Sequence, residues 1–297
     1  MTDDTASPDA GRANWLGSLW MVAAMAGFAV EDLFLKTAAQ TLPVGQVMVF
    51  FGLGGAIVFW IAAKARREVI LAPQAFGRTM IIRSGFEVGG RLFYTLAIAL
   101  TPLSSATAIL QATPIVVVAG AALFFGETVG WRRWSAILVG LAGVLVIIRP
   151  GAESFTAMSL LAVLGMLGFA GRDLATRAAP PALGTAALGV FGFAAIVAAG
   201  AAYSVWQGAH WSVPGAGAAL GLTLAVLFGV LGYSSLTRAM RTGEVSAVTP
   251  FRYSRLIFGI GLGMLVFGER PDAATWAGSA IVVLSGLYIL SRSRRAR

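Results

Sequence analysis

Residues 104–134 read SSATAILQATPIVVVAGAALFFGETVGWRRW, and the pattern within them returns later in the chain. Ser104, Thr107, Phe125-Gly126-Glu127 and Trp134 are repeated 142 positions further on as Ser246, Thr249, Phe267-Gly268-Glu269 and Trp276. A second motif, GFAVEDL at residues 27–33, is repeated 141 positions further on as GFAGRDL at residues 168–174. Two motifs in the same order at nearly one spacing predict two copies of a unit of about 140 residues.

The composition of the 297-residue chain is that of a membrane protein. Hydrophobic residues make up 58% and charged residues 12%, and the mean hydropathy is +0.81. A soluble domain averages about 25% charged residues, so we expect an integral membrane protein. The net charge of +9 is explained by the basic bias of cytoplasmic loops, so no nucleic-acid partner is expected. The lack of cysteine excludes thiolate metal sites, and nothing in the sequence indicates a metal, a cofactor or a protein partner.

Ten apolar runs are each close to the length of about 20 residues that a membrane-spanning helix needs. They cover residues 15–36, 43–63, 79–100, 103–125, 132–148, 157–176, 184–206, 216–240, 245–267 and 273–291. The predicted fold is therefore an all-α membrane protein with ten transmembrane helices. The first repeat would cover residues 15–148 and the second 157–291, between a polar, disordered tail at 1–14 and a basic tail at 292–297.

Lysine and arginine in the connections predict that both ends of the chain lie in the cytoplasm. With that orientation, three basic residues lie on the outer side (Lys36, Arg149 and Arg270) and fifteen on the inner side. The inner set is Arg12, Lys64, Arg66, Arg67, Arg78, Arg132, Arg133, Arg172, Arg177, Arg238, Arg241, Arg292, Arg294, Arg295 and Arg297. Because five helices per repeat is an odd number, the second repeat must insert upside down. Inverted repeats are the usual construction of alternating-access transporters, which bind substrate near the bilayer midplane.

Charged side chains inside the predicted helices are candidates for the substrate path, since a charge near the bilayer centre costs roughly 2.5–3.5 kcal/mol. The third run carries Arg83, Glu87 and Arg91 at a spacing of four, with Tyr94 continuing the same face. These residues form either a self-neutralising ladder or a polar wall of the substrate path. Arg83 lies close enough to the inner face to extend its guanidinium toward water.

The ninth run carries a polar stripe that consists of Ser246, Thr249, Arg252 and Tyr253 and is followed by Arg255. Neither arginine has an acid in the body of that helix, so both need partners from other helices. Glu87 is the nearest candidate by depth. A guanidinium beside a cavity is a good receptor for carboxylate or phosphate, and a purely structural role for the two arginines is the alternative.

The fourth run places Thr107, Gln111 and Pro114 on one face. Pro114 removes a backbone hydrogen bond and can kink the helix. The ninth run has its proline at Pro250, outside the repeat frame of Pro114, so matching kinks do not follow from the sequence. Gln111 aligns with Tyr253 across the repeat, which predicts ligand contacts at paired midplane positions. Hydrogen bonding between helices is the alternative.

The repeated GFAxxDL motif suggests gates at the two mouths of the bundle. Glu31, Asp32 and Lys36 end the first run near the outer face, whereas Asp173 and Arg177 end the sixth run near the inner face. We interpret Asp32–Lys36 and Asp173–Arg177 as ion pairs and as matched gate elements. Plain helix-end pairs worth a few tenths of a kcal/mol are the alternative. Glu31 is also a candidate proton carrier.

Two five-helix halves, each with Phe-Gly-Glu and a tryptophan seven residues later, resemble the EamA family of the drug/metabolite transporter superfamily. The runs TPLSSATA at 101–108 and PFRYSR at 250–255 fit that pattern, and the resemblance covers residues 15–291. It implies a bacterial inner-membrane protein with a central cavity lined from both halves. The resemblance favours the following residues as candidates for lining this cavity: Glu87, Arg91, Gln111, Tyr233, Thr237, Arg252 and Tyr253.

The leading interpretation is a secondary transporter of a small organic metabolite, since the chain has no ATP-binding motif. The arginines favour a substrate carboxylate and Tyr94, Tyr233 and Tyr253 suit an apolar part, so an amino acid or derivative fits both. A vitamin, nucleobase, S-adenosylmethionine-like compound or drug is the second interpretation. A membrane-embedded enzyme is remote, because there is no His-Glu-x-x-His motif and the one histidine, His210, lies between apolar runs. A channel is equally remote, and ten helices can form a complete transporter as a monomer.

Overall fold

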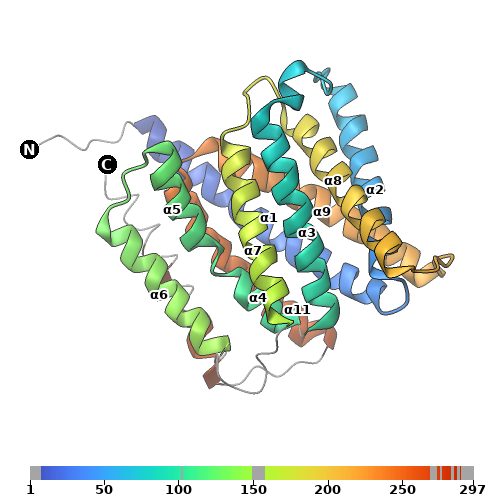
Figure 1. Cartoon of the computed structure of the whole chain (residues 1–297). Helices are drawn as coiled ribbons and strands as arrows, with labels where there is room; N and C mark the ends of the chain where they lie inside the picture. The colour runs from blue at the N-terminus through green and yellow to red at the C-terminus, as the bar shows by residue number, and fades with distance from the viewer. Residues whose placement is uncertain are drawn as a thin grey trace, which may run out of the picture.

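The computed structural model describes residues 8–101, 103–148 and 158–267, together with 273–274, 276–281, 284–285 and 288. Every regular element in this part of the chain is helical, and the helices pack as one bundle (Figure 1). The first repeat supplies α1 (Pro8–Ala39), α2 (Val44–Ala65), the short 3-10 helix η1 (Pro73–Phe76), α3 (Arg78–Leu100), α4 (Leu103–Leu110), α5 (Thr113–Phe125) and α6 (Trp131–Ile148). The second supplies α7 (Ser159–Arg177), α8 (Thr185–Gln207), α9 (Ala216–Thr242), α10 (Val245–Val248), the 3-10 helix η2 (Thr249–Tyr253) and α11 (Ser254–Phe267).

The all-helical prediction is confirmed, and four helices are long and apolar enough to cross a membrane. They are residues Gly11–Ala39 of α1, and α2, α8 and α9. Charged side chains lower the hydropathy of α3 and α7, and breaks shorten the fourth and ninth predicted helices. The tenth predicted run lies only partly within the described residues, so the count of ten spanning helices stays a prediction.

The first helix begins earlier than the sequence predicted. α1 starts at Pro8 rather than near residue 15, and its first turns are anchored by the side chain of Asn14. The Asn14 Oδ1 atom accepts a hydrogen bond from the backbone N–H of Glu244 at 2.8 Å. This contact holds residues 8–14 on the bundle, whereas the terminal segments 1–7 and 292–297 lie outside the described residues.

The fourth and ninth predicted helices are both broken, which the sequence interpretation as continuous runs missed. The fourth divides into α4 and α5 at Gln111-Ala112, and the ninth divides into α10, η2 and α11. Pro114 and Pro250 each lack the N–H that a continuous helix needs. The Thr113 hydroxyl donates to the Leu110 carbonyl at the first break. Shifted by 142 residues, α4 falls on α10 and the first four residues of η2, and α5 falls on α11, so the first break matches the junction of η2 with α11.

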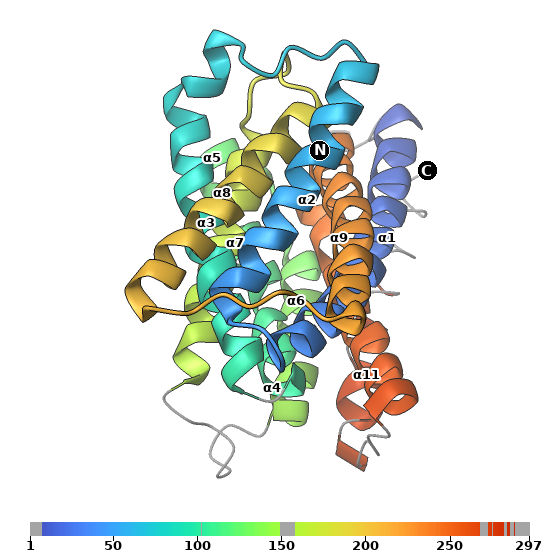
Figure 2. The same cartoon turned by 90° about the vertical axis from the view of Figure 1, so that its right-hand side faces the viewer.

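The helix pairs also follow the repeat. α1 packs most extensively against α9, and their repeat mates α7 and α3 pack against each other, while α2 packs against its own mate α8 (Figure 2). A glycine from each helix meets at the two matching crossings. A Cβ atom on Gly27 would lie 3.0 Å from Gly232 Cα, and one on Gly90 would lie 3.0 Å from the carbonyl carbon of Gly168. Backbones that approach so closely need small residues at the contact, and both contacts bring together helices from different halves.

Candidate substrate-binding site

Helix α1 carries two adjacent carboxylates that bind arginines from two other helices. Asp32 forms an ion pair with Arg255 at the start of α11, and its Oδ2 atom also accepts a hydrogen bond from the Tyr94 hydroxyl of α3 at 3.3 Å. Glu31 binds the Arg91 guanidinium of α3 at 2.6 Å. All five side chains are almost completely buried. The pairs therefore join α1 and α3 of the first half to α11 of the second.

Helix α7 carries the matching group in the second repeat. Asp173 accepts a 2.6 Å hydrogen bond from the neighbouring Arg172 and forms an ion pair with Arg252 of η2. Arg172 also reaches across to α3, where its Nη1 atom lies 3.1 Å from Glu87 Oε1. Asp32 and Asp173 are thus repeat mates that each hold one arginine of the broken ninth helix.

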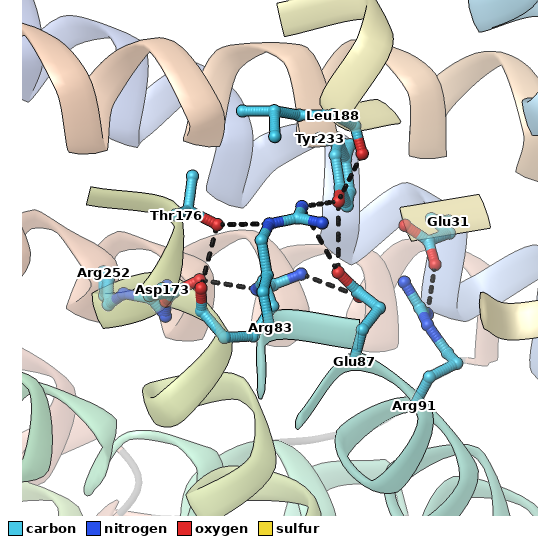
Figure 3. A network of polar contacts seen from close by, with 10 residues as sticks. Glu31, Arg83, Glu87, Arg91, Asp173, Thr176, Leu188, Tyr233 and Arg252 are labelled. Carbon is cyan, nitrogen blue, oxygen red and sulfur yellow. Dashed lines mark hydrogen bonds and ion pairs between the residues drawn. The ribbon is translucent and has the colours of Figure 1, made fainter. Parts of the chain in front are cut away.

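A third group extends this network toward α8 and α9 (Figure 3). The Arg83 side chain donates to the Thr176 hydroxyl at 2.9 Å and to the oxygen of Tyr233, and lies 3.7 Å from Glu87 Oε2. The Tyr233 hydroxyl donates in turn to Glu87 Oε2 at 3.1 Å. Arg83 is fully buried, so the prediction that it extends toward water at the inner face is wrong. The reason is that α7 and α9 cover it and supply its hydrogen-bond acceptors.

These groups surround a small cavity at the junction of the two halves. Its lining consists of Met25, Phe28, Arg91, Tyr94, Leu110, Phe169, Arg172, Arg252 and Arg255. The cavity volume is about 20 Å³, which is room for about one or two water molecules. This volume is too small for a metabolite, so the surrounding helices would need to move apart to admit one.

Aromatic rings form the other part of the cavity wall. Phe28 and Phe169 occupy the same position of the repeated GFAxxDL motif, and both line the cavity. The Arg255 guanidinium lies 5.4 Å from the centre of the Phe28 ring, and that of Arg172 lies 5.0 Å from the centre of Phe169. Cations at these distances are attracted to the face of an aromatic ring. The repeated motif therefore supplies one apolar wall from each half.

The partners predicted for the ninth-helix arginines were wrong. Arg252 and Arg255 bind Asp173 and Asp32 rather than Glu87, because the break in the helix turns both guanidinium groups toward α7 and α1. The expected pairing of Asp173 with Arg177 is also replaced, since Arg177 donates to the carbonyl oxygen of Met240 at 3.3 Å. Lys36 donates to the carbonyl oxygens of Ile98 and Thr101.

Four of the predicted substrate-path residues line the cavity, namely Arg91, Tyr94, Arg252 and Arg255. Glu87 lies one contact behind it, through Arg172, and Tyr233 binds Glu87 in turn. The remaining ones are buried in the neighbouring helices without lining the cavity, and these are Thr107, Gln111, Thr237, Thr249 and Tyr253. The Tyr253 hydroxyl donates to the Ile137 carbonyl of α6 at 3.2 Å, which favours a packing role there.

Sequence reasoning missed Arg172, which it had placed on the inner membrane surface. The residue is buried and lines the cavity between Glu87 and Asp173. One signal could have found it, because Arg172 occupies the same motif position as Glu31. Phe28, Phe169, Leu110 and Met25 were missed as well, since apolar lining residues have no sequence signal that separates them from ordinary core.

Residues 15–149 and 156–292 each match the model of the EamA-like transporter family. The chain belongs to this family. The pseudopaline exporter CntI of Pseudomonas aeruginosa is 31% identical over 286 residues, with 94% of this chain and 97% of that protein covered. An S-adenosylmethionine uptake transporter of Rickettsia conorii is 24% identical, with 97% of both proteins covered. A riboflavin transporter of Rhizobium johnstonii is 26% identical over 94% of this chain and 92% of that protein.

A solved crystal structure shares the fold, with a TM-score of 0.72 over 94% of this chain and 98% of the other, at 18% identity. The EamA match makes the chain a multi-pass membrane protein of a transporter family and not an enzyme. The three relatives are similar to it along almost their whole length and carry three different substrates. Family membership therefore gives the class of activity, whereas the class of substrate has to be inferred from the residues that line the cavity.

The Phe-Gly-Glu motif of this EamA protein ends α5 and places a carboxylate against the second half. Gly126 adopts a left-handed conformation, with φ of 64°, that ends the helix and turns the chain. The next residue, Glu127, then accepts hydrogen bonds at 3.0 Å from the backbone N–H groups of Val245 and Ser246. A carboxylate of the first half thus satisfies the first N–H groups of the broken ninth helix in the second half. The repeat mate Glu269 lies outside the described residues.

Proposed function

We propose that this EamA protein is a secondary transporter that moves a small carboxylate-bearing metabolite across the bacterial inner membrane by alternating access. An amino acid or an amino-acid derivative is the first candidate. The observation that carries the proposal is the cavity lined by Arg91, Arg172, Arg252 and Arg255 at the junction of the halves. Guanidinium groups match a carboxylate with two parallel hydrogen bonds, and Tyr94 with the two phenylalanines suits an apolar part.

The proposed mechanism rests on two inverted five-helix repeats, residues 15–148 and 157–291, with both termini in the cytoplasm. The matched contacts of α1 with α9 and of α7 with α3 support this, because an exchange of the two halves maps one contact on to the other. The two broken helices support it as well, since discontinuous helices at the repeat interface commonly form substrate sites in transporters. In this mechanism Asp32 and Asp173 hold opposite sides of the cavity closed through their arginines, and Glu31, Lys36 and Arg177 belong to the same moving elements.

A second candidate is a transporter of a ring compound such as a vitamin, a nucleobase or an S-adenosylmethionine-like molecule. The S-adenosylmethionine and riboflavin transporters among the relatives favour it, and so do the aromatic faces of Phe28 and Phe169 in the cavity wall. The two candidates differ in what the arginines do, because in the second they would serve mainly to hold the helices together.

The test is thermal unfolding of the detergent-purified protein with amino acids, their N-acetyl derivatives and their decarboxylated amines, such as the set tyrosine, N-acetyltyrosine and tyramine and the set histidine, N-acetylhistidine and histamine. Riboflavin, S-adenosylmethionine and adenine complete the panel. A ligand at 100 times its dissociation constant stabilises the folded state by about 2.7 kcal/mol. We expect the N-acetylated acid of each set to raise the midpoint and the amine to leave it unchanged.

Arg252→Gln should abolish the shift, whereas Arg66→Gln, which removes an exposed arginine outside the cavity, should keep it. Equal shifts with amines, or with uncharged rings in the Arg252→Gln variant, would contradict carboxylate recognition and favour the second candidate. Counterflow of the binding compound in proteoliposomes then tests transport itself, and binding without counterflow would contradict the transporter assignment.

A further inference from the structure

The charges buried around the cavity do not balance. Within the part of the chain that the structure describes, the buried charged side chains are the arginines 83, 91, 172, 252 and 255 and the carboxylates Glu31, Asp32, Glu87 and Asp173. Every carboxylate has at least one arginine partner, and each group is counted at its formal charge. Five guanidinium groups against four carboxylates leave the network with one excess positive charge.

The excess is concentrated on the wall of the cavity. Four of the five arginines line it, and no aspartate or glutamate is among the described residues that line it. The Nε atoms of Arg91, Arg252 and Arg255 have no hydrogen-bond partner in the described structure although they are buried. Buried donors without partners are unusual in proteins and call for an explanation. Three such donors on residues around one cavity point to a ligand that accepts hydrogen bonds.

Free acceptors are also present, but they are not part of the cavity wall. Glu31 Oε2 and Asp32 Oδ1 lack partners, yet neither residue lines the cavity. Glu31 Oε2 faces α9, where a Cβ atom on Gly229 would lie 3.2 Å away. An ammonium group of a ligand therefore meets arginines and aromatic rings in the cavity, and its charge is opposed by the excess positive charge there.

We propose that the site selects substrates of net charge −1, in which carboxylate groups outnumber cationic groups by one. This inference rests on the proposed function and narrows its substrate class. Dicarboxylic amino acids and N-acylated amino acids have this charge, whereas zwitterionic amino acids carry no net charge and basic ones are cationic. The anionic group binds the arginines of the cavity, and the apolar part lies against Phe28 and Phe169. Binding of such a substrate neutralises the buried network, which makes the occupied bundle better able to rearrange than the empty one.

The test measures the charge preference of the cavity without knowledge of the substrate. The chain has no cysteine, so Leu110→Cys introduces a single thiol into the cavity lining. The full-length variant is reacted in detergent with three methanethiosulfonates of similar size, carrying a sulfonate, a hydroxyl or a trimethylammonium group. Each forms a disulfide with the thiolate and releases methanesulfinate. The ratio of the rates cancels any effect of the cavity on the thiol itself.

We expect the sulfonate reagent to react at least tenfold faster than the trimethylammonium reagent, relative to their ratio at a His210→Cys control in an exposed connection. The neutral reagent should lie between them. Met25→Cys, also in the lining, repeats the measurement if the first variant does not fold. Equal rates, or a faster cationic reagent, would overturn the inference and leave the proposed transport untouched. If none of the three reagents reaches either thiol, the cavity does not open to water, and the proposed function fails with the inference.

Discussion

The two broken helices have the same backbone plan and different chemistry. Leu110 and Thr113 flank the break of the first repeat, and their repeat mates in the second are Arg252 and Arg255. Both breaks lie at matching positions, so the duplicated segment determines where the helix is interrupted beside the cavity. Only the second repeat places charge there. Both halves therefore contribute to the cavity wall, whereas only the second half places guanidinium groups at its broken helix.

The largest expected effect is on the free energy of unfolding, and it differs between the broken helix that carries charge and the one that does not. Arg255→Gln leaves Asp32 buried with no ion-pair partner among the contacts described here, and breaking a buried ion pair costs about 3–5 kcal/mol. The repeat-equivalent change Thr113→Val removes one hydrogen bond to Leu110 and costs about 1 kcal/mol. Chemical denaturation of both variants in the same detergent measures the difference.

The double variant Asp32→Asn with Arg255→Gln serves as the control for that prediction. It removes both charges, so it should be clearly more stable than Arg255→Gln alone. If the double variant loses as much stability as the two single changes added together, the two side chains do not interact, and the asymmetry between the breaks is not electrostatic.

The second prediction concerns a feature that the two halves share. A Cβ atom on Gly90 would lie 2.9 Å from the backbone nitrogen of Phe169, and one on Gly27 would lie 3.0 Å from Gly232 Cα. Gly90→Ala and Gly27→Ala should each lower the free energy of unfolding by about 1–3 kcal/mol, since overpacking forces the backbones apart. Gly89→Ala is the matched control, because nothing lies within 4 Å of its Cβ position. A loss at only one crossing would mean that the halves do not pack as equivalent units.

The third and smallest expected effect concerns the hydrogen bonds that join Glu127 of the first half to the broken ninth helix of the second. Glu127→Gln keeps one acceptor for the N–H groups of Val245 and Ser246 and loses the charge, which should weaken the contact by about 1.4 kcal/mol. That corresponds to a roughly tenfold faster labelling of a cysteine introduced as Ala247→Cys by a soluble maleimide. Glu68→Gln is the control, because Glu68 accepts from the Ala187 N–H of α8 at 3.0 Å in the same way and does not touch α10. Unchanged labelling in Glu127→Gln would show that Glu127 does not restrain the broken helix.

Much of the fold could be predicted from the sequence, because the repeat and the apolar runs can both be recognised without knowledge of tertiary contacts. The 142-residue offset predicted the paired halves, and the apolar runs predicted the helices with edges close to those observed. The breaks at Gln111 and Thr249–Tyr253 were missed, because the segments on either side of each break are apolar enough to be read as one spanning run. A proline alone does not determine whether a helix kinks or breaks. The outcome depends on which neighbouring groups hydrogen-bond to the backbone carbonyl oxygens that lose their partners within the helix.

Four of the nine cavity-lining residues were predicted from the sequence, and their contacts were not. The cost of burying charge in a bilayer singled out Arg91, Arg252 and Arg255 correctly as buried residues of the bundle. The partners could not be derived, because Asp32 and Asp173 come from helices whose depth the sequence fixes only to within a few residues. Arg172 was assigned to the inner surface for the same reason, since a short shift along α7 moves a side chain from the cavity to the membrane face.

The most direct test of the central claim uses the first-repeat mate of Arg252. Leu110→Cys is reconstituted in vesicles of known orientation, and a membrane-impermeant maleimide is added to the outside of right-side-out or of inside-out vesicles. Alternating access predicts labelling from both sides, slowed in both cases by the compound that stabilises the purified protein. Labelling from one side only would contradict it, because a cavity that never opens to the second side binds its ligand without transporting it.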